Sequence, residues 1–250
     1  TAIGYNALTA LRATGGGNFG GVNNTAVGYE AGGSGVFGGG SDGHGDDNTL
    51  VGHQAGKAIT TGSANTCLGD RAGTTLNIGI RNVLVGKGAG QLMTDNNQNI
   101  AIGWGALDAA AAGEHSNIAI GHNALTTENS NANFCVAIGE AALALQNGNV
   151  KNTAIGGLAG DAIVGGTANT LLGYSSGSSI VSGNKNTVIG HNSYVLGTAS
   201  NNTVIGYAAG SSTVDGTPTA AMSGDNNVLL GSYAGYGLTD GPGNVLIGKS

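Results

Sequence analysis

A five-residue motif recurs along the whole chain and limits the folds open to it. Each full copy holds Asn, then Thr, Val or Ile, then a small or aliphatic residue, then an aliphatic residue and Gly, as in Asn82–Gly86. There are fourteen copies, of which the first lacks its Asn and another carries Cys135 in the place of Asn. The copies end at Gly4, Gly28, Gly52, Gly69, Gly86, Gly103, Gly121, Gly139, Gly156, Gly173, Gly190, Gly206, Gly231 and Gly248.

The spacing of these glycines indicates a solenoid. Most intervals are nearly equal, as from Gly52 to Gly69 and from Gly69 to Gly86, and three intervals are clearly longer. The underlying period of about 17 is too short for two stable helices, whereas Thr, Val and Ile bounded by Gly favour a short strand. We therefore predict an all-β fold, a single-stranded parallel β-solenoid of about 14 coils with one repeat in each coil.

The array is predicted to be continuous. We expect residues 1–250 to form one β-roll repeat array, an excerpt of a longer fibre protein, with loop insertions near residues 11–23, 32–47 and 211–226. A second apolar patch follows many motifs, as at Ile163-Val164 and Ile180-Val181, and is predicted to form a return strand. Two strands and two tight turns would then close each coil.

The Asn and Gly of the motif have separate predicted roles. Asn tolerates a tight corner, and its amide can bond backbone groups there or form a ladder with the Asn of neighbouring coils. Gly permits a positive φ or the close approach of the next backbone.

Both faces of the motif strand are apolar. Side chains alternate along a strand, so the first and third residues after Asn share one face and the second takes the other. One face fills the coil, and a long exposed apolar ridge on the other usually marks an interface. We predict a homotrimer interface formed by the second position, namely Ala26, Leu50, Leu84, Ala101, Ala119, Ala137, Ala154, Leu171, Val188, Val204, Leu229 and Leu246.

Composition excludes several classes of protein. A chain with 50 Gly but only 2 Pro does not have the composition of collagen. Its aliphatic residues recur at regular intervals, which is not typical of a disordered chain. The 8 basic and 14 acidic residues are scattered, so we expect no nucleic-acid partner. No apolar run is long enough to cross a bilayer, so we expect no membrane insertion by this segment.

The repeat resembles that of a known family. The order in Asn24–Ala31 of Asn, a small β-branched residue, two apolar residues, Gly, two free positions and Ala is similar to the head repeat of YadA-like trimeric autotransporter adhesins, also met in trimeric phage tail fibres. The resemblance implies a left-handed parallel β-roll, three chains packed side by side, no cofactor, and an extracellular place on a bacterial cell surface or phage virion.

The resemblance and the loops together predict attachment to a host or cell surface, with a surface glycan or protein as partner. Ligand contacts should concentrate on loops and on aromatic turn residues. The candidates are Tyr29, Trp104, Tyr207, Tyr233 and Tyr236. The loop that holds Asp42, His44, Asp46 and Asp47 could wrap a calcium ion with oxygen ligands, or it could be a solvated loop.

Two further motifs resemble catalytic or nucleotide-binding sequences but are better explained by the structural repeat. The sequence Gly243–Ser250 matches a phosphate-binding loop and Gly173–Gly177 matches a nucleophile elbow, but both fall on repeat positions. We predict no catalytic or cofactor site. The alternative function is a β-helical polysaccharide-degrading enzyme of the tailspike type, which would need paired carboxylates about 5 to 9 Å apart on neighbouring coils.

Overall fold

The computed structural model describes residues 1–9, 21–33, 45–109, 113–127, 133–147, 151–194, 197–211, 213–214, 217–218, 224–238 and 241–249. The chain divides into two compact units, Thr1–Asn133 and Phe134–Ser250. Parts of all three predicted insertions lie outside the described residues.

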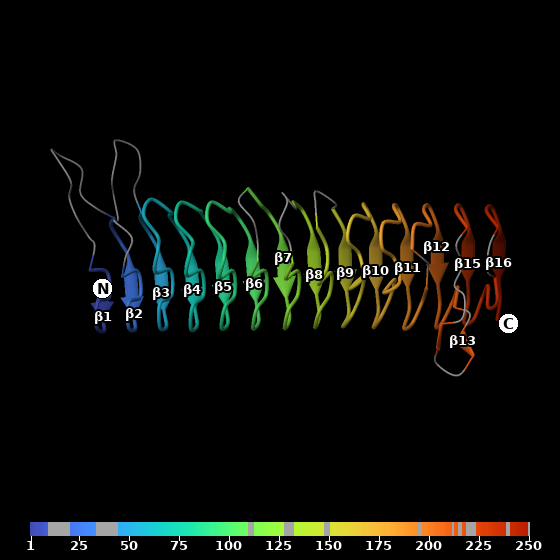
Figure 1. The fold of residues 1–250 in the computed structure, drawn as a ribbon, viewed down its shortest axis with the longest axis horizontal. Coiled ribbons are helices and arrows are strands. Elements are labelled where there is room, and N and C mark those ends of the chain that lie inside the picture. The colour runs from blue at the N-terminus through green and yellow to red at the C-terminus, as the bar shows by residue number, and fades with distance from the viewer. Residues whose placement is uncertain are drawn as a thin grey trace. The chain divides into compact units, whose positions relative to one another are not determined.

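The first unit is a parallel β-solenoid with one short strand in each repeat. Every strand pairs in parallel with the next strand in the sequence, and equivalent motif residues are in register, as in Leu50 with Cys67 and Ala101 with Ala119. Figure 1 shows the strands side by side in chain order. They are β1 (Ala2–Ile3), β2 (Thr25–Val27), β3 (Thr49–Val51), β4 (Thr66–Leu68), β5 (Val83–Val85), β6 (Ile100–Ile102) and β7 (Ile118–Ile120).

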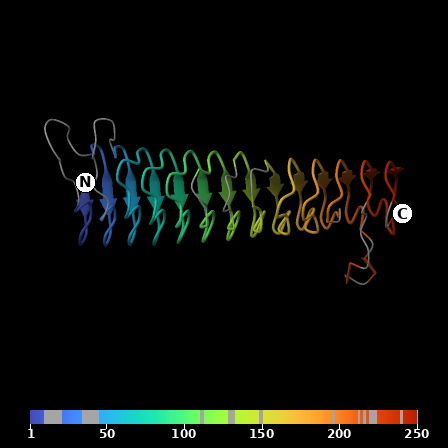
Figure 2. The ribbon, with the colours of Figure 1, turned by 45° about the horizontal axis from the view of Figure 1, so that its top comes forward.

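The second unit repeats this architecture. Its parallel strands are β8 (Val136–Ile138), β9 (Thr153–Ile155), β10 (Thr170–Leu172), β11 (Thr187–Ile189), β12 (Thr203–Ile205), β15 (Val228–Leu230) and β16 (Val245–Ile247). A small antiparallel pair, β13 (Thr213–Val214) and β14 (Thr217–Pro218), lies within the third insertion. The turned view in Figure 2 shows the same stacking of strands in this unit. The predicted all-β parallel solenoid and its repeat period are therefore confirmed.

The interior of each coil is filled mainly from two positions. Between the first strand and the last, the middle residue of each parallel strand is fully buried, for example Leu84 and Leu171 at 0% exposure. The third residue after the motif Gly, usually Ala, is buried beside it, for example Ala89 and Ala159. Because Ala is small, the strand and the turn that follows it can pack closely.

The remaining interior space is filled in two ways. In several coils Gly stands four residues after the motif Gly and a large apolar residue follows it, as with Gly56 and the fully buried Ile59. A Cβ on Gly56 would lie 2.8 Å from Ile59 Cδ1, so the two positions compete for one space. Other coils place a buried Leu in the Gly slot, as at Leu107 and Leu143, at the cost of a positive φ.

The predicted return strand is wrong for the described residues. The segment opposite the motif consists of turns and bends with isolated bridges, such as Ile180 to Gly197. The N–H groups of Asn77, Ile78 and Gly79 all donate to the carbonyl of Thr94. A strand pairs its N–H groups with successive partners, whereas here the backbone curls around a single acceptor. The apolar residues of this segment are still used, since Ile163 and Ile180 are fully buried.

The predicted asparagine ladder is confirmed. The backbone N–H and the Nδ2 of Asn65 both donate to Oδ1 of Asn48, at 3.0 and 3.1 Å. The same Nδ2 donates to the carbonyl of Gly79 at 2.8 Å. Asn82 repeats this arrangement on Asn65, and both side chains are almost fully buried. Each Asn therefore links its own coil to both neighbours.

The motif Gly is required by close packing. Gly69 has φ of 138°, and a Cβ placed on it would lie 2.6 Å from the carbonyl oxygen of Gly86. No side chain fits at such a distance, so successive coils approach closely at this corner. The predicted roles of Gly, a positive φ and close backbone approach, both hold here.

The coil in which Cys135 replaces the motif Asn has a substitute for the missing amide. Cys135 occupies the Asn slot and is fully buried. Gln146 lies at the position that Ile163 occupies in the next coil; its Nε2 lies 3.1 Å from Cys135 Sγ, and its Oε1 accepts from Asn152 Nδ2 at 2.9 Å. The amide oxygen of Gln146 thus takes the place of the Oδ1 that an Asn at position 135 would offer to Asn152.

We expect Asn82→Ala to lower the free energy of unfolding by about 2 kcal/mol or more, because the buried N–H of Asn99 loses its acceptor. Urea denaturation followed by the fluorescence of the single tryptophan, Trp104, measures this loss. The exposed Asn77→Ala is the control, and an equal shift in the two variants would contradict the role of the ladder.

We expect Gln146→Leu alone to destabilise the second unit by about 1 to 3 kcal/mol, since Asn152 Nδ2 loses an acceptor in a buried position. Combining it with Cys135→Asn restores the usual motif and should recover most of the loss. A double-mutant cycle in urea measures this coupling. Additive effects of the two substitutions would show that Gln146 does not substitute for the missing Asn.

Candidate functional site

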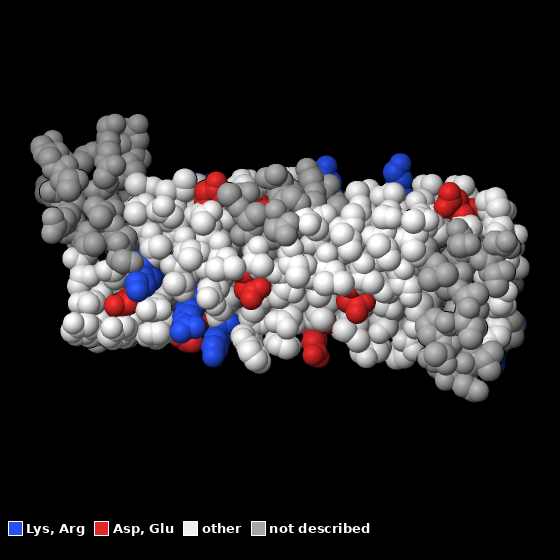
Figure 3. All heavy atoms as spheres, in the orientation of Figure 1, with Lys and Arg blue, Asp and Glu red and all other residues white. Residues whose placement is uncertain are grey.

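The outer face of the strands forms one candidate surface. The first and third motif residues point away from the coil and are exposed or half-buried, as with Val83, Leu68 and Ile102. Because the strands are in register, the third residues form an aliphatic column in each unit. No residue of the parallel strands is charged. Figure 3 shows that charged side chains are also sparse on the face of the molecule drawn there.

The residues predicted to form the homotrimer interface lie inside the coil instead. Leu246, on the last described strand of its unit, is 38% exposed, whereas the others have 0% exposure and so cannot contact a second chain. The alternation was predicted correctly, but the two faces were assigned the wrong way round. The buried residues are Ala26, Leu50, Leu84, Ala101, Ala119, Ala137, Ala154, Leu171, Val188, Val204 and Leu229.

The side chains that follow the motif Gly form a second candidate surface at the turn edge of the first unit. Tyr5 stacks on Tyr29 and Tyr29 packs on His53, each with ring centroids 5.5 Å apart. Trp104 packs on His122 at 4.9 Å. These rings line up because equivalent residues of stacked coils share one position in space.

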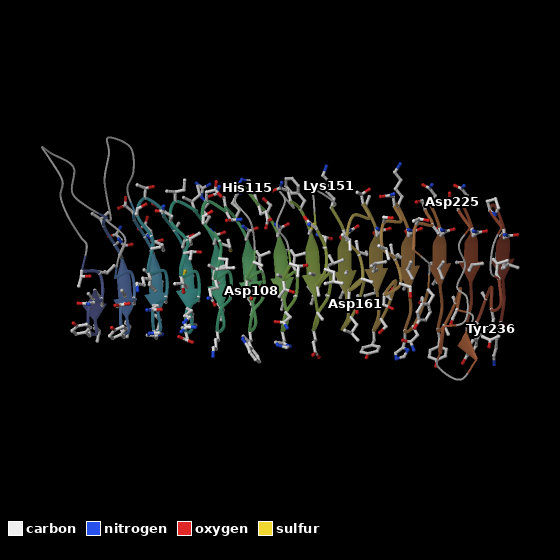
Figure 4. The ribbon with its side chains drawn as sticks, viewed as in Figure 1. Asp108, His115, Lys151, Asp161, Asp225 and Tyr236 are labelled. Carbon is white, nitrogen blue, oxygen red and sulfur yellow. The ribbon has the colours of Figure 1, made fainter. Side chains whose placement is uncertain are left out.

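The second unit has an aromatic group at the equivalent turns. His191 stacks between Tyr174 and Tyr207, with centroids 5.3 and 5.6 Å apart. Tyr233 meets Tyr207 and Tyr236 edge to face. The structure therefore brings together the predicted ligand contacts Tyr207, Tyr233 and Tyr236, the last of which is labelled at the turn edge in Figure 4.

Charged groups accompany the rings of the first unit. His53 Nδ1 lies 2.7 Å from Asp70 Oδ1, and this hydrogen bond holds the pKa of Asp70 below its usual value. Lys57 lies 2.6 Å from Glu30 and lowers the pKa of that carboxyl in the same way. The positive and negative charges at this edge therefore compensate each other.

The predicted ion-binding loop is described only in part. Asp42 and His44 lie outside the described residues. Asp46 Oδ1 accepts from the N–H of Val22 at 2.7 Å, and Asp47 Oδ1 accepts from Asn23 Nδ2 at 3.0 Å. Among the described residues, His, Cys, Asp and Glu side chains form no group of three or more that could hold a metal ion.

Two acids have raised pKa values because they are partly buried, Asp108 in the first unit and Asp161 in the second. Both stand five residues after a motif Gly, and Figure 4 labels them. The motif copies that end at Gly121 and Gly139 stand between them in the sequence, so the two acids do not come from consecutive repeats, as a pair of carboxylates on neighbouring coils would.

The phosphate-loop and nucleophile-elbow matches fall on the strands and turns of the repeat. Residues Val245–Ile247 of the phosphate-loop match form strand β16. In the nucleophile-elbow match Ser175 lies in a turn with φ of 50°, and Ser176 Oγ donates to the carbonyl of Val188 at 2.7 Å. Cys67 and Cys135 are buried free thiols.

No protein-family model matches this chain, and neither the curated proteins nor the solved structures contain a match. Among the described residues, no helix has the length and apolar character needed to cross a membrane.

The sequence interpretation missed the outward role of the first and third motif residues. A signal was present, because Ala and Cys occur at the second position while bulkier residues fill the third. Small residues fit a thin coil that must also hold an Ala from the following turn. The first and third positions therefore replace the second as the candidate contact surface.

We expect Cys67 and Cys135 to resist thiol reagents in the native protein and to react only on unfolding. Burial removes access and raises the pKa of Cys67 to about 12, so raising the pH from about 7 to about 9 should leave the folded thiol unreactive. Reaction with a chromogenic disulfide, with and without denaturant, tests this. The exposed Asn77→Cys should label at once, and rapid labelling of Cys67 would contradict its inward orientation.

Proposed function

We propose that this chain is a structural and adhesive fibre segment, a left-handed β-roll that assembles side by side as a homotrimer and displays its turns and loops for attachment to a host or cell surface. The observation that carries the proposal is the uncharged, in-register outer face of the strands. Leu68 is 46% exposed, Leu172 is 45% exposed, and each lies in a column of aliphatic residues. A column of this kind favours association with an identical column.

The free energy gained by burying apolar surface between chains supports a permanent assembly. If each coil buries on the order of 40 Å² of apolar surface against a second chain, it gains about 1 kcal/mol at 25 cal/mol per Å². Because the coils repeat, these small gains accumulate along each unit. Self-association also fits the resemblance to trimeric adhesin heads and tail fibres, whose chains pack through their motif strands.

The turn edge and the loop insertions would then remain on the periphery. Insertions interrupt the repeat without contributing to its columns, which suits them for contact with varied partners. An extracellular place, on a bacterial surface or a phage virion, follows from this role and from the resemblance.

We expect light scattering of the purified chain to give three times the chain mass of 24.1 kDa. A well-folded monomer would overturn the proposed assembly, and so would a stable dimer.

The double variant Leu68→Glu with Ile102→Glu should dissociate the trimer and leave the coil folded, because it places charges on the outer face only. Light scattering and circular dichroism measure the two properties. Leu92→Glu is the matched control, since Leu92 is 53% exposed and lies off the strands. If the double variant kept the mass of the unaltered protein, the outer face would not be the interface.

A further inference from the structure

The turn edge of the first unit carries a row of exposed or half-buried side chains, one from each successive coil. Every member directly follows a motif Gly, so the row runs in the direction in which the coils stack. Tyr29 is 47% exposed and Trp104 is 62% exposed. The row consists of Tyr5, Tyr29, His53, Asp70, Lys87, Trp104 and His122.

The spacing of the row favours a repeating ligand. The centroids of neighbouring rings are 4.9 to 5.5 Å apart, which is one side chain per coil. A compact small molecule would touch only one or two members. A linear polymer laid along the row can meet an equivalent contact at every coil. One ring of an extended, equatorially linked sugar chain is about as long as this spacing.

The chemistry of the row matches that of a sugar chain. Aromatic rings have an apolar body with a negative face, against which sugar C–H groups pack, and Tyr adds a hydroxyl at its tip. Between the rings, His53, Asp70 and Lys87 supply donors and an acceptor for sugar hydroxyls. The Nζ of Lys87 lies 4.0 Å from Asp70 Oδ2, and the Lys87 side chain is 63% exposed.

Other linear polymers fit less well. A nucleic acid would meet a chain with a net charge of −6 and a row in which the charge of Lys87 is offset by that of Asp70. An extended peptide that adds to a sheet needs an unpaired strand edge, and β2 to β6 are paired on both sides. A neutral chain that offers both C–H faces and hydroxyls suits this row best.

We propose that the row binds a neutral linear polysaccharide lying parallel to the stacking direction, with about one sugar ring per coil. This inference rests on the proposed function, because it names the class of surface polymer to which the fibre segment attaches. The row Tyr174, His191 and Tyr207 of the second unit repeats the same slots and provides a second, shorter site of the same kind.

Calorimetric titration with chitin and cellulose oligosaccharides, from the disaccharide to the octasaccharide, tests the proposal. We expect affinity to rise with chain length, since each added ring reaches another coil. Trp104→Ala and Tyr29→Ala should each weaken binding of the longest oligosaccharide by about tenfold. Phe134→Ala is the control, because Phe134 is 65% exposed but precedes a strand and lies outside the row.

The outcomes separate this inference from the proposed assembly. If the protein has the mass of a trimer but binds none of the oligosaccharides, the polysaccharide site is overturned and the fibre proposal stands. Binding without length dependence, or an equal loss in Phe134→Ala, also overturns the site. If the protein is a monomer and binds with the expected length dependence, the site is supported and the assembly is overturned.

Discussion

A buried asparagine amide that bonds to the next coil is the interaction on which this structure depends. Its Oδ1 accepts from the backbone and the side chain of the following Asn, as between Asn65 and Asn82, and its Nδ2 satisfies a carbonyl at the corner. These bonds keep equivalent residues of successive coils in register. The outer aliphatic columns and the row of turn side chains both follow from that register.

The need for close contact between successive coils also explains which positions of the repeat can vary. Gly69 cannot accept a side chain because the next backbone is too close. Where Cys135 replaces the motif Asn, the amide of Gln146 lies beside it and bonds to Asn152. Residues that point outward have no such limits. Tyr29, Asp70 and Trp104 differ in charge and size although they occupy equivalent slots. The same corner geometry in successive coils thus permits different side chains at the turn edge.

Sequence patterns were sufficient for the repeat, its strand and the asparagine ladder, because Asn, β-branched residues and Gly each have a local preference that the fold obeys. They were insufficient to predict which side chains of the strand point into the coil. Ala101 and Ile102 are both apolar, and alternation alone does not say which of them points inward. The prediction of a return strand was wrong for another reason. Several backbone N–H groups donate to the carbonyl of Thr94, and no local preference of the residues predicts such an arrangement. The stacking of Tyr29 and His53 became visible only with the coil geometry.

The insertion between β12 and β15 leaves the coils around it unchanged. Val204 still pairs with Leu229, and the N–H of Asn227 still donates to Asn202 Oδ1 at 2.9 Å across 25 residues of chain. The additional residues between β12 and β15 therefore do not alter the register of the two strands. A foreign peptide grafted at this segment should therefore be tolerated, because the strand pairing and the asparagine bond that join β12 to β15 do not depend on the length of chain between them.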